Sequence, residues 1–135
     1  MMLAKAEVTS DTKYAQDIVM GRHAMQSDEP ERLGGADSGP APYQILLASL
    51  GACTSITLRM YAERKGWELG TVRIHLALTR DEAGGESIAR EIAVSAPLTD
   101  EQRARLLEIA GKTPVTKTLL KGVAIDSRFA KRNDP

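Results

Sequence analysis

The chain has 135 residues, a length suited to one domain, and we expect a single domain over residues 1–135. Its composition, 42% hydrophobic and 27% charged residues, is that of a soluble globular protein. Eighteen basic and eighteen acidic side chains give a formal net charge of zero, which argues against nucleic acid or an anionic membrane as a partner.

The first part of the chain is expected to form short strands. Residues 4–9 and 14–20 flank a polar, turn-like cluster at residues 10–13, which predicts a hairpin, and residues 23–26 could add a third strand. Residues 27–40 are rich in glycine, proline and acidic side chains, which predicts a long loop. Loops of this length in small domains are often functional.

A long helix of about 24 residues is predicted to begin at Pro42, because proline suits the first turn, and to end near Gly66. Small and apolar residues recur at steps of three and four, which predicts a broad buried face. The residues of this face are Ile45, Leu46, Ala48, Ser49, Ala52, Cys53, Ile56 and Met60. Such a helix would cross the whole domain, so a sheet is expected to wrap around it.

The uncharged run from Ala41 to Leu58 is long enough to raise the question of a membrane span. Polar side chains punctuate the run and Arg59 closes it, which favours a buried helix of a soluble protein. Residues 1–7 lack the apolar core of a signal peptide. The single cysteine excludes an intrachain disulfide and fits a reducing compartment, so we expect a cytoplasmic protein.

Two strands are predicted after the helix. Apolar and polar side chains alternate over residues 72–79, which indicates a half-buried strand, and residues 87–96 supply its partner.

Two further helices and a last strand complete the expected order. Thr99 and Gln102 match a capping box, which predicts a helix to about residue 111, and Pro114 opens a short helix that ends near Gly122. Residues 123–129 alternate again and predict a last strand. The order of strands, long helix, strands, helices and strand predicts an α+β fold.

Cys53 is the residue of greatest chemical interest, although a lone cysteine on an apolar helix is more often an inert core residue than a nucleophile. Its small and polar neighbours leave space beside the sulfur and offer hydroxyls to a thiolate or a peroxide. These neighbours are Ser49, Gly51, Thr54, Ser55 and Thr57. The alternative is that small residues let two helices approach closely, for instance at a dimer interface.

The block GGADSGPAPYQILLASLGACT at residues 34–54 resembles the loop and central helix of the OsmC/Ohr family, the osmotically inducible protein C and organic hydroperoxide resistance proteins. The segment TPVTKTL at residues 113–119 is similar to a later helix of that family. DEP at residues 28–30 and RMYAERKGW at residues 59–67 resemble its OsmC-like branch. The resemblance covers most of the chain and implies a long central helix wrapped by antiparallel sheet, in an intertwined homodimer with active sites at the subunit interface.

The resemblance also implies a chemistry. The family's first cysteine, matched by Cys53, attacks an organic hydroperoxide as a thiolate and becomes a sulfenic acid. An arginine stabilises that thiolate and a glutamate holds the arginine. Because Cys53 lies in mid-helix, the helix dipole contributes little and a nearby cation is required. The candidates are Arg22, Arg32 and Lys13, although for any single one of them a solvated surface charge is the more common interpretation.

Two positions depart from the family pattern. Tyr43 stands where the family has the glutamate, and Thr113 stands where it has the second, resolving cysteine. Thr113 is suited instead to cap the helix that Pro114 opens. Without a resolving thiol, oxidised Cys53 would need an external or intersubunit reductant.

Two functions therefore remain open. The first is a stress-response thiol peroxidase that reduces organic hydroperoxides with Cys53 and an external thiol reductant. The second is a non-catalytic dimeric module that binds a hydrophobic small molecule in the inherited pocket, motivated by the changes at Tyr43 and Thr113. No cofactor or metal is expected, since His23 and His75 are not spaced as ligands and no second cysteine joins them.

Overall fold

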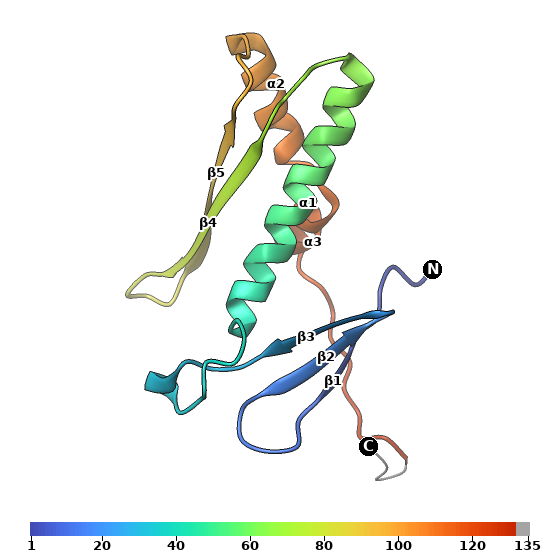
Figure 1. Cartoon of the computed structure of the whole chain (residues 1–135), viewed down its shortest axis with the longest axis vertical. Helices are drawn as coiled ribbons and strands as arrows, with labels where there is room; N and C mark the ends of the chain where they lie inside the picture. Colours follow the sequence, from blue (N-terminus) through green and yellow to red (C-terminus); the bar gives the residue numbers. More distant parts are fainter. Residues whose placement is uncertain (132–135) are drawn as a thin grey trace. The chain divides into compact units, whose positions relative to one another are not determined.

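A computed structural model describes residues 1–131 of the chain as an α+β structure (Figure 1). Its elements are β1 (Glu7–Thr9), β2 (Gln16–Met20), β3 (His23–Ser27), the 3-10 helix η1 (Glu31–Leu33), α1 (Pro42–Lys65), β4 (Val72–Arg80), β5 (Glu86–Val94), α2 (Asp100–Ala110) and α3 (Pro114–Lys121). The contacts divide the chain into two units. Of the described residues, unit 1 holds residues 1–45 and 127–131, and unit 2 holds residues 46–126. A single domain over residues 1–135 stays a prediction.

Unit 1 contains a three-stranded antiparallel sheet in the order β1-β2-β3. Glu7 pairs with Val19, and Gln16 pairs with Ser27. Lys13, in the turn between β1 and β2, has a left-handed φ of 51°, which fits a tight reversal of the chain. The predicted hairpin and third strand are confirmed.

The loop after β3 is organised by the buried carboxylate of Asp28, which is only 3% exposed. One of its oxygens accepts the backbone N–H of Glu29 at 2.7 Å. The other accepts the N–H of Ala36 at 3.1 Å, and both the N–H and the hydroxyl of Ser38 at 3.2 and 2.9 Å. Burial raises the pKa of Asp28, but the hydrogen bonds from Ser38, Glu29 and Ala36 outweigh burial and hold this pKa below its ordinary value.

The helix α1 begins at Pro42 and ends at Lys65, as predicted. Gly66 has a φ of +72°, and its N–H donates to the carbonyl of Glu63 at 3.1 Å. The N–H of Trp67 donates to the carbonyl of Ala62 at 2.9 Å. This left-handed glycine satisfies the last carbonyls of the helix and terminates it.

The core of unit 2 lies between α1, α2 and the chain that follows α1. Its buried residues are Leu58, Ala62, Leu69, Leu106 and Ala110. Apolar side chains of the β4–β5 hairpin pack against this cluster, among them Val72, Ile92 and Val94. The hairpin is therefore covered on one face, as its alternation predicted.

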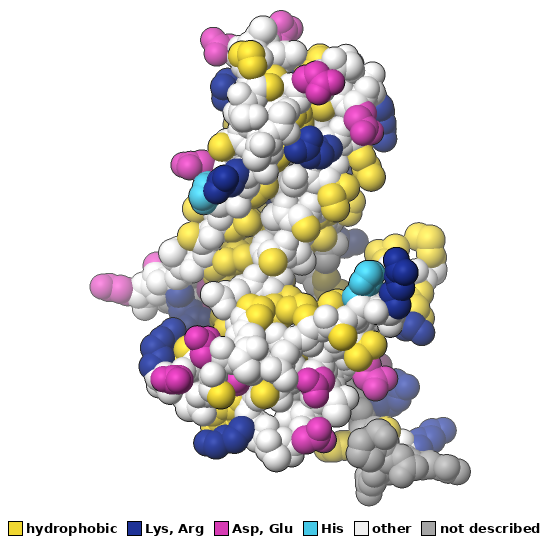
Figure 2. Space-filling model, viewed as in Figure 1, with side chains coloured by type: hydrophobic (Ala, Val, Ile, Leu, Met, Phe, Trp, Pro, Cys, Tyr) yellow, Lys and Arg dark blue, Asp and Glu magenta, His cyan; other side chains and the backbone are white. Residues whose placement is uncertain are grey.

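The predicted buried face of α1 is wrong, because none of its residues is fully buried and Ala48, Ser49, Ala52, Ile56 and Met60 are exposed. The buried residues are Leu50, Gly51, Thr54, Leu58 and Ala62. Ile56 and Met60, placed on the buried face from the sequence, are each 54% exposed, and Figure 2 shows hydrophobic side chains at the surface along α1. Both sets of residues recur with a helical period, so periodicity alone cannot tell which of two apolar stripes the chain covers.

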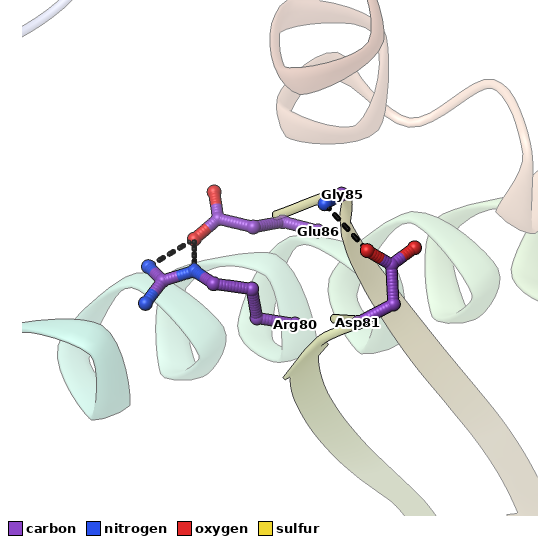
Figure 3. A network of polar contacts seen from close by, with 4 residues as sticks. All are labelled: Arg80, Asp81, Gly85 and Glu86. Atoms are coloured by element: carbon purple, nitrogen blue, oxygen red, sulfur yellow. Dashed lines mark hydrogen bonds and ion pairs between the residues drawn. The ribbon is translucent and has the colours of Figure 1, made fainter. Parts of the chain in front are cut away.

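The hairpin in unit 2 pairs β4 and β5 over nine residues each, from Val72 opposite Val94 to Arg80 opposite Glu86. At its turn Asp81 accepts the N–H of Gly85 at 2.8 Å, and Arg80 donates twice to one carboxylate oxygen of Glu86, at 2.6 and 3.2 Å (Figure 3). This ion pair is exposed, so it contributes little stability.

A glycine brings the hairpin close to α1. A Cβ atom at Gly51 would lie 2.8 Å from the Cδ1 of Leu76, which is closer than real Cβ contacts. A larger residue at position 51 would therefore require the Leu76 side chain to shift. Leu76 is also the register partner of Arg90 on β5, so this approach places Arg90 near the turn of α1 that follows Gly51.

Both later helices have the caps expected from the sequence. The Thr99 side chain accepts the N–H of Gln102 at 3.0 Å, and the Gln102 side chain accepts the N–H of Thr99 at 2.9 Å, which completes the capping box of α2. Thr113 caps α3 by accepting the N–H of Thr116 at 3.2 Å.

The predicted last strand over residues 123–129 is wrong. In the described chain these residues have no regular secondary structure, and Val123, Ile125 and Phe129 are 67%, 88% and 98% exposed. An alternating pattern specifies a strand only when a neighbouring strand takes up its N–H and C=O groups. Among residues 1–131, the two sheets formed by β1–β3 and β4–β5 include no such neighbour.

Candidate functional site

Cys53 lies in the middle of α1, within unit 2, as a free and partly exposed cysteine. The next residue, Thr54, is fully buried, and Ala52 is exposed. The sulfur therefore lies at the boundary between the core and the surface of this helix. No residue of α1 before Arg59 is charged, so any charge near Cys53 must come from another element.

Arg90 is the charged residue that unit 2 brings to this part of α1. On β5 the partly buried positions are Ile88, Arg90, Ile92 and Val94, so a charge occupies a position in phase with aliphatic side chains. The partly buried positions of β4 are all aliphatic. Arg90 is thus the one charged side chain on the covered face of the hairpin.

The guanidinium of Arg90 is held by three neutral oxygens from three helices. One terminal nitrogen donates to the hydroxyl of Thr54 on α1 at 3.0 Å and to the hydroxyl of Thr116 on α3 at 2.9 Å. The other terminal nitrogen donates to the carbonyl of Ala110 on α2 at 2.8 Å. The direct neighbour of Cys53 therefore anchors the arginine.

The threonine hydroxyls extend this network. The hydroxyls of Thr113 and Thr116 lie 2.6 Å apart, and the hydroxyl of Thr54 donates to the carbonyl of Leu50 at 2.7 Å. Thr54 and Thr113 are fully buried. Thr113, which stands where the resemblance implies a resolving cysteine, thus carries a hydroxyl that caps α3 and contacts the residue that holds Arg90.

Arg90 has no acidic partner: within residues 1–131, no carboxylate forms an ion pair with it. Burial lowers the pKa of Arg90, and the negative charge of an ionised Cys53 acts in the opposite direction and raises it. Arginine remains protonated at any physiological pH. The site therefore combines a partly exposed thiol with a fixed positive charge that neutral groups hold.

The cations predicted from the sequence all belong to unit 1. Arg22, Arg32 and Lys13 are exposed residues of unit 1, whereas Cys53 belongs to unit 2. Tyr43 lies in the first turn of α1 and is 56% exposed. The roles of Cys53, Arg22 and Arg32 in catalysis stay predictions.

The sequence reasoning missed Arg90, although a signal for it was present. The expected strand over residues 87–96 carries Ile88, Ile92 and Val94 at every second position, and Arg90 falls in the same phase. A charge at an inward position of an alternating strand needs partners inside the protein, which makes it a candidate site residue.

Metal binding finds no support in the described residues. Within residues 1–131 no group of three or more histidine, cysteine, aspartate or glutamate side chains is placed to hold a metal ion.

The fold, with a cysteine on its long central helix, defines the class of protein. A model of the OsmC-like protein family matches residues 35–128, which is more than half of the chain. The chain therefore belongs to the OsmC-like protein family, as its resemblance to the OsmC/Ohr proteins indicated.

Solved structures share this fold over most of the chain. An OsmC-like protein from Mycoplasma pneumoniae is 16% identical with a TM-score of 0.76, over 88% of each chain. An organic hydroperoxide resistance protein from Elizabethkingia anophelis is 21% identical with a TM-score of 0.64, over 87% of this chain and 88% of that one. The organic hydroperoxide resistance protein OhrB of Bacillus subtilis is 25% identical with a TM-score of 0.59, over 87% of this chain and 91% of that one. No curated protein matched the sequence.

The family fold also bears on the apolar helix. By length and composition alone α1 could cross a membrane, with a mean hydropathy of 1.4 over its most apolar part. Leu58 and Ala62 on this helix, however, lie in the core of unit 2 with Leu106. We interpret α1 as a core helix rather than a membrane span.

Proposed function

We propose that this chain is a one-cysteine thiol peroxidase that reduces organic hydroperoxides with Cys53 in the cytoplasm. The observation that carries the proposal is a free, partly exposed cysteine on the central helix, whose neighbour Thr54 accepts a hydrogen bond from Arg90, a cation that forms no ion pair within residues 1–131. Two proteins of the same fold are named organic hydroperoxide resistance proteins, which supports the substrate class. A reducing compartment would keep the thiol reduced between turnovers.

The proposed cycle needs one protein thiol and two equivalents of an external thiol. The Cys53 thiolate attacks the distal peroxide oxygen, the O–O bond breaks, and the alkoxide takes up a proton and leaves as the alcohol. Cys53 is thereby oxidised to sulfenic acid. A first external thiol condenses with the sulfenic acid to a mixed disulfide and water, and a second releases reduced Cys53 together with the external disulfide. Thr113 cannot act as a resolving group because it has no sulfur.

The decisive experiment measures consumption of cumene hydroperoxide by the wild-type protein and by Cys53→Ser, each with dithiothreitol as reductant. We expect turnover by the wild type and none above background by Cys53→Ser. The matched control is Thr57→Ser, which replaces one hydroxyl side chain by another on the same helix and keeps Cys53. Equal rates for the wild type and Cys53→Ser with several thiol reductants would exclude the proposal.

The second candidate is a non-catalytic module that binds a hydrophobic small molecule near Cys53. The observation that favours it is the buried Thr113, whose hydroxyl is committed to capping α3 at the position of the resolving thiol. A dimedone-type reagent separates the two functions. Trapping of a Cys53 sulfenic acid at stoichiometric hydroperoxide supports the peroxidase, and a thiol that resists trapping supports the binding module.

We further propose that the protein acts as a homodimer. The support is the exposed apolar stripe on α1, where Ile56 and Met60 are each 54% exposed, together with the exposed Val123 and Ile125. Apolar faces of this kind are costly in water and are usually covered by a partner. Light scattering coupled to gel filtration is expected to give twice the chain mass for the wild type and a lower mass for Ile56→Lys/Met60→Lys. A wild-type monomer at micromolar concentration would contradict the dimer.

A further inference from the structure

We infer that a cavity between β5 and α2 binds a short-chain carboxylate. The cavity lies wholly within unit 2, since every residue that lines it falls between residues 46 and 126. Cys53 is not among these residues, so the cavity is distinct from the candidate site on α1. The inference goes beyond the proposed function and does not depend on it.

The walls of the cavity are aliphatic. Ile92 and Val94 come from the covered face of β5, Leu98 from the connection to α2, and Leu106 from the buried face of that helix. Leu107 completes the wall and is 66% exposed, so an apolar side chain borders the opening to solvent. An alkyl chain that enters this space exchanges water for apolar contacts, which is favourable.

The size of the cavity limits the ligand. Its volume is about 200 Å³, whereas sites for drug-sized ligands measure about 300 to 1,000 Å³. Leu106 on its wall belongs to the core cluster of unit 2 and is only 4% exposed, so the cavity cannot deepen without disturbing the core. A short alkyl chain therefore fits better than a ring system or a long acyl chain.

Arg103 supplies the one charge among the lining residues. Within residues 1–131 its guanidinium forms no ion pair and no hydrogen bond. Asp100 and Glu101, which lie at the start of the same helix, do not pair with it. Because Arg103 is an exposed residue, its charge stays accessible to an anion that arrives from solvent.

Arg105, on the same helix, has the partners that Arg103 lacks. Its side chain donates to the hydroxyl of Tyr61 at 2.8 Å and lies 2.9 Å from a carboxylate oxygen of Glu108. The alkyl stem of an arginine can lie along an aliphatic wall while its guanidinium faces water. A cation without an anion, beside an apolar cavity, is complementary to an anion that carries an apolar tail. A carboxylate suits it because its two oxygens can accept paired N–H groups of a guanidinium.

The test is a titration of the full chain at pH 7, followed by the backbone amide signals in NMR spectra. The probes are octanoate, octan-1-ol and octylammonium, which share one chain and differ in the head group. We expect octanoate to bind about threefold more tightly than octanol, as for an exposed ion pair, and octylammonium to bind more weakly than octanol. Hexanoate, which is shorter by two methylene groups, is expected to bind about tenfold more weakly than octanoate.

Variants assign the charge. Arg103→Gln is expected to abolish the preference for octanoate over octanol and to leave the affinity for octanol unchanged. The control is Arg73→Gln, which removes an exposed arginine from the other face of the hairpin and should keep the preference.

Variants also locate the chain of the ligand. Val94→Phe, which places a larger side chain in the cavity, is expected to abolish the binding of octanoate and octanol. If it fails to fold, Leu107→Ser takes its place, since this position is exposed, and should weaken the binding of both probes about threefold.

Equal affinities of the wild type for octanoate and octanol overturn the inference, as does octanoate binding that the variants of the cavity wall leave unchanged. Absence of octanoate binding also overturns it, and a lower mass of Leu107→Ser in light scattering would then show that a second copy covers the cavity. Cys53→Ser is expected to bind octanoate as the wild type does, so the result is independent of peroxidase activity.

Discussion

Asp28 in unit 1 and Arg90 in unit 2 are both charged and withdrawn from solvent, and within the described residues neither forms an ion pair. The partners of Asp28 are N–H and O–H donors that all lie within ten residues of it in its own loop. The partners of Arg90 come from three separate helices. One charge is satisfied by local chain geometry and the other by tertiary packing.

The difference lies in what stands next to each charge. Every hydrogen-bond partner of the Asp28 carboxylate is a donor from its own loop, so the charge itself orders the loop and its removal should loosen the chain. Arg90 is bonded by groups that retain other partners, since the hydroxyl of Thr54 also bonds to Leu50 and that of Thr116 lies beside Thr113. Arg90 therefore carries less of the stability.

Asp28→Asn is expected to give the largest loss of stability. The amide nitrogen cannot accept a hydrogen bond, so donors among Glu29, Ala36 and Ser38 lose their acceptor inside the loop. Urea unfolding measures the effect. Asp37→Asn, which changes an exposed aspartate of the same loop, is the control and should behave as the wild type. Equal unfolding midpoints for the two variants would remove the contrast between Asp28 and Arg90.

The contribution of Asp28 should also depend on pH. Its pKa in the folded protein lies below the ordinary value of 3.8, so the folded state favours the ionised form. The resulting stabilisation is complete above the ordinary value and is lost as the pH falls through the lower folded value. On acidification from about pH 5 to about pH 2.5, the free energy of unfolding of the wild type should fall more steeply than that of Asp28→Asn. Parallel curves would contradict this.

Thr113→Val is expected to reduce the free energy of unfolding by about 1 kcal/mol, the usual cost of removing a helix cap. The change removes the acceptor of the Thr116 N–H and the hydroxyl that lies beside that of Thr116. Thr118→Val, at an exposed position of the same helix, is the control. A loss no larger than that of the control would mean that Thr113 does not support the group that holds Arg90.

Arg90→Met is expected to cost less, about 1 kcal/mol or below, because each acceptor that it releases keeps a second partner and the hairpin face gains an apolar side chain. Urea unfolding of this variant beside Arg73→Met gives the difference. A loss as large as that of Asp28→Asn would show that Arg90 is also a structural charge.

Glu86→Gln should have the smallest effect, below about 0.5 kcal/mol, because its ion pair with Arg80 lies at an exposed hairpin turn. The change in its free energy of unfolding is the reference value for a charge that has an oppositely charged partner in solvent. The small loss should shrink further in high salt, since exposed pairs are screened. A loss above 1 kcal/mol that does not respond to salt would contradict the expected order of stability losses, which is largest at Asp28, smaller at Arg90 and smallest at Glu86.

Local rules explain what the sequence predicted well. Pro42 and Gly66 bound α1, Thr99 with Gln102 and Thr113 cap the later helices, and alternation identified the β4–β5 hairpin. Each of these features depends on residues within a few positions of one another, and so the sequence specifies it directly. The place of Cys53 on a long central helix was specified in the same way.

Tertiary structure decided the features that join distant segments. It selected the Leu50–Leu58–Ala62 stripe of α1 for the core and left Ile56 and Met60 exposed, a choice between two stripes of equal period. Within the part of the chain that the structure describes, it also left residues 123–129 outside both sheets. Most importantly, it brought Arg90, which lies far along the chain, to the neighbour of Cys53 through Thr54 and Thr116. No local pattern encodes such a contact, because the partners of a buried charge are set by the packing of whole elements.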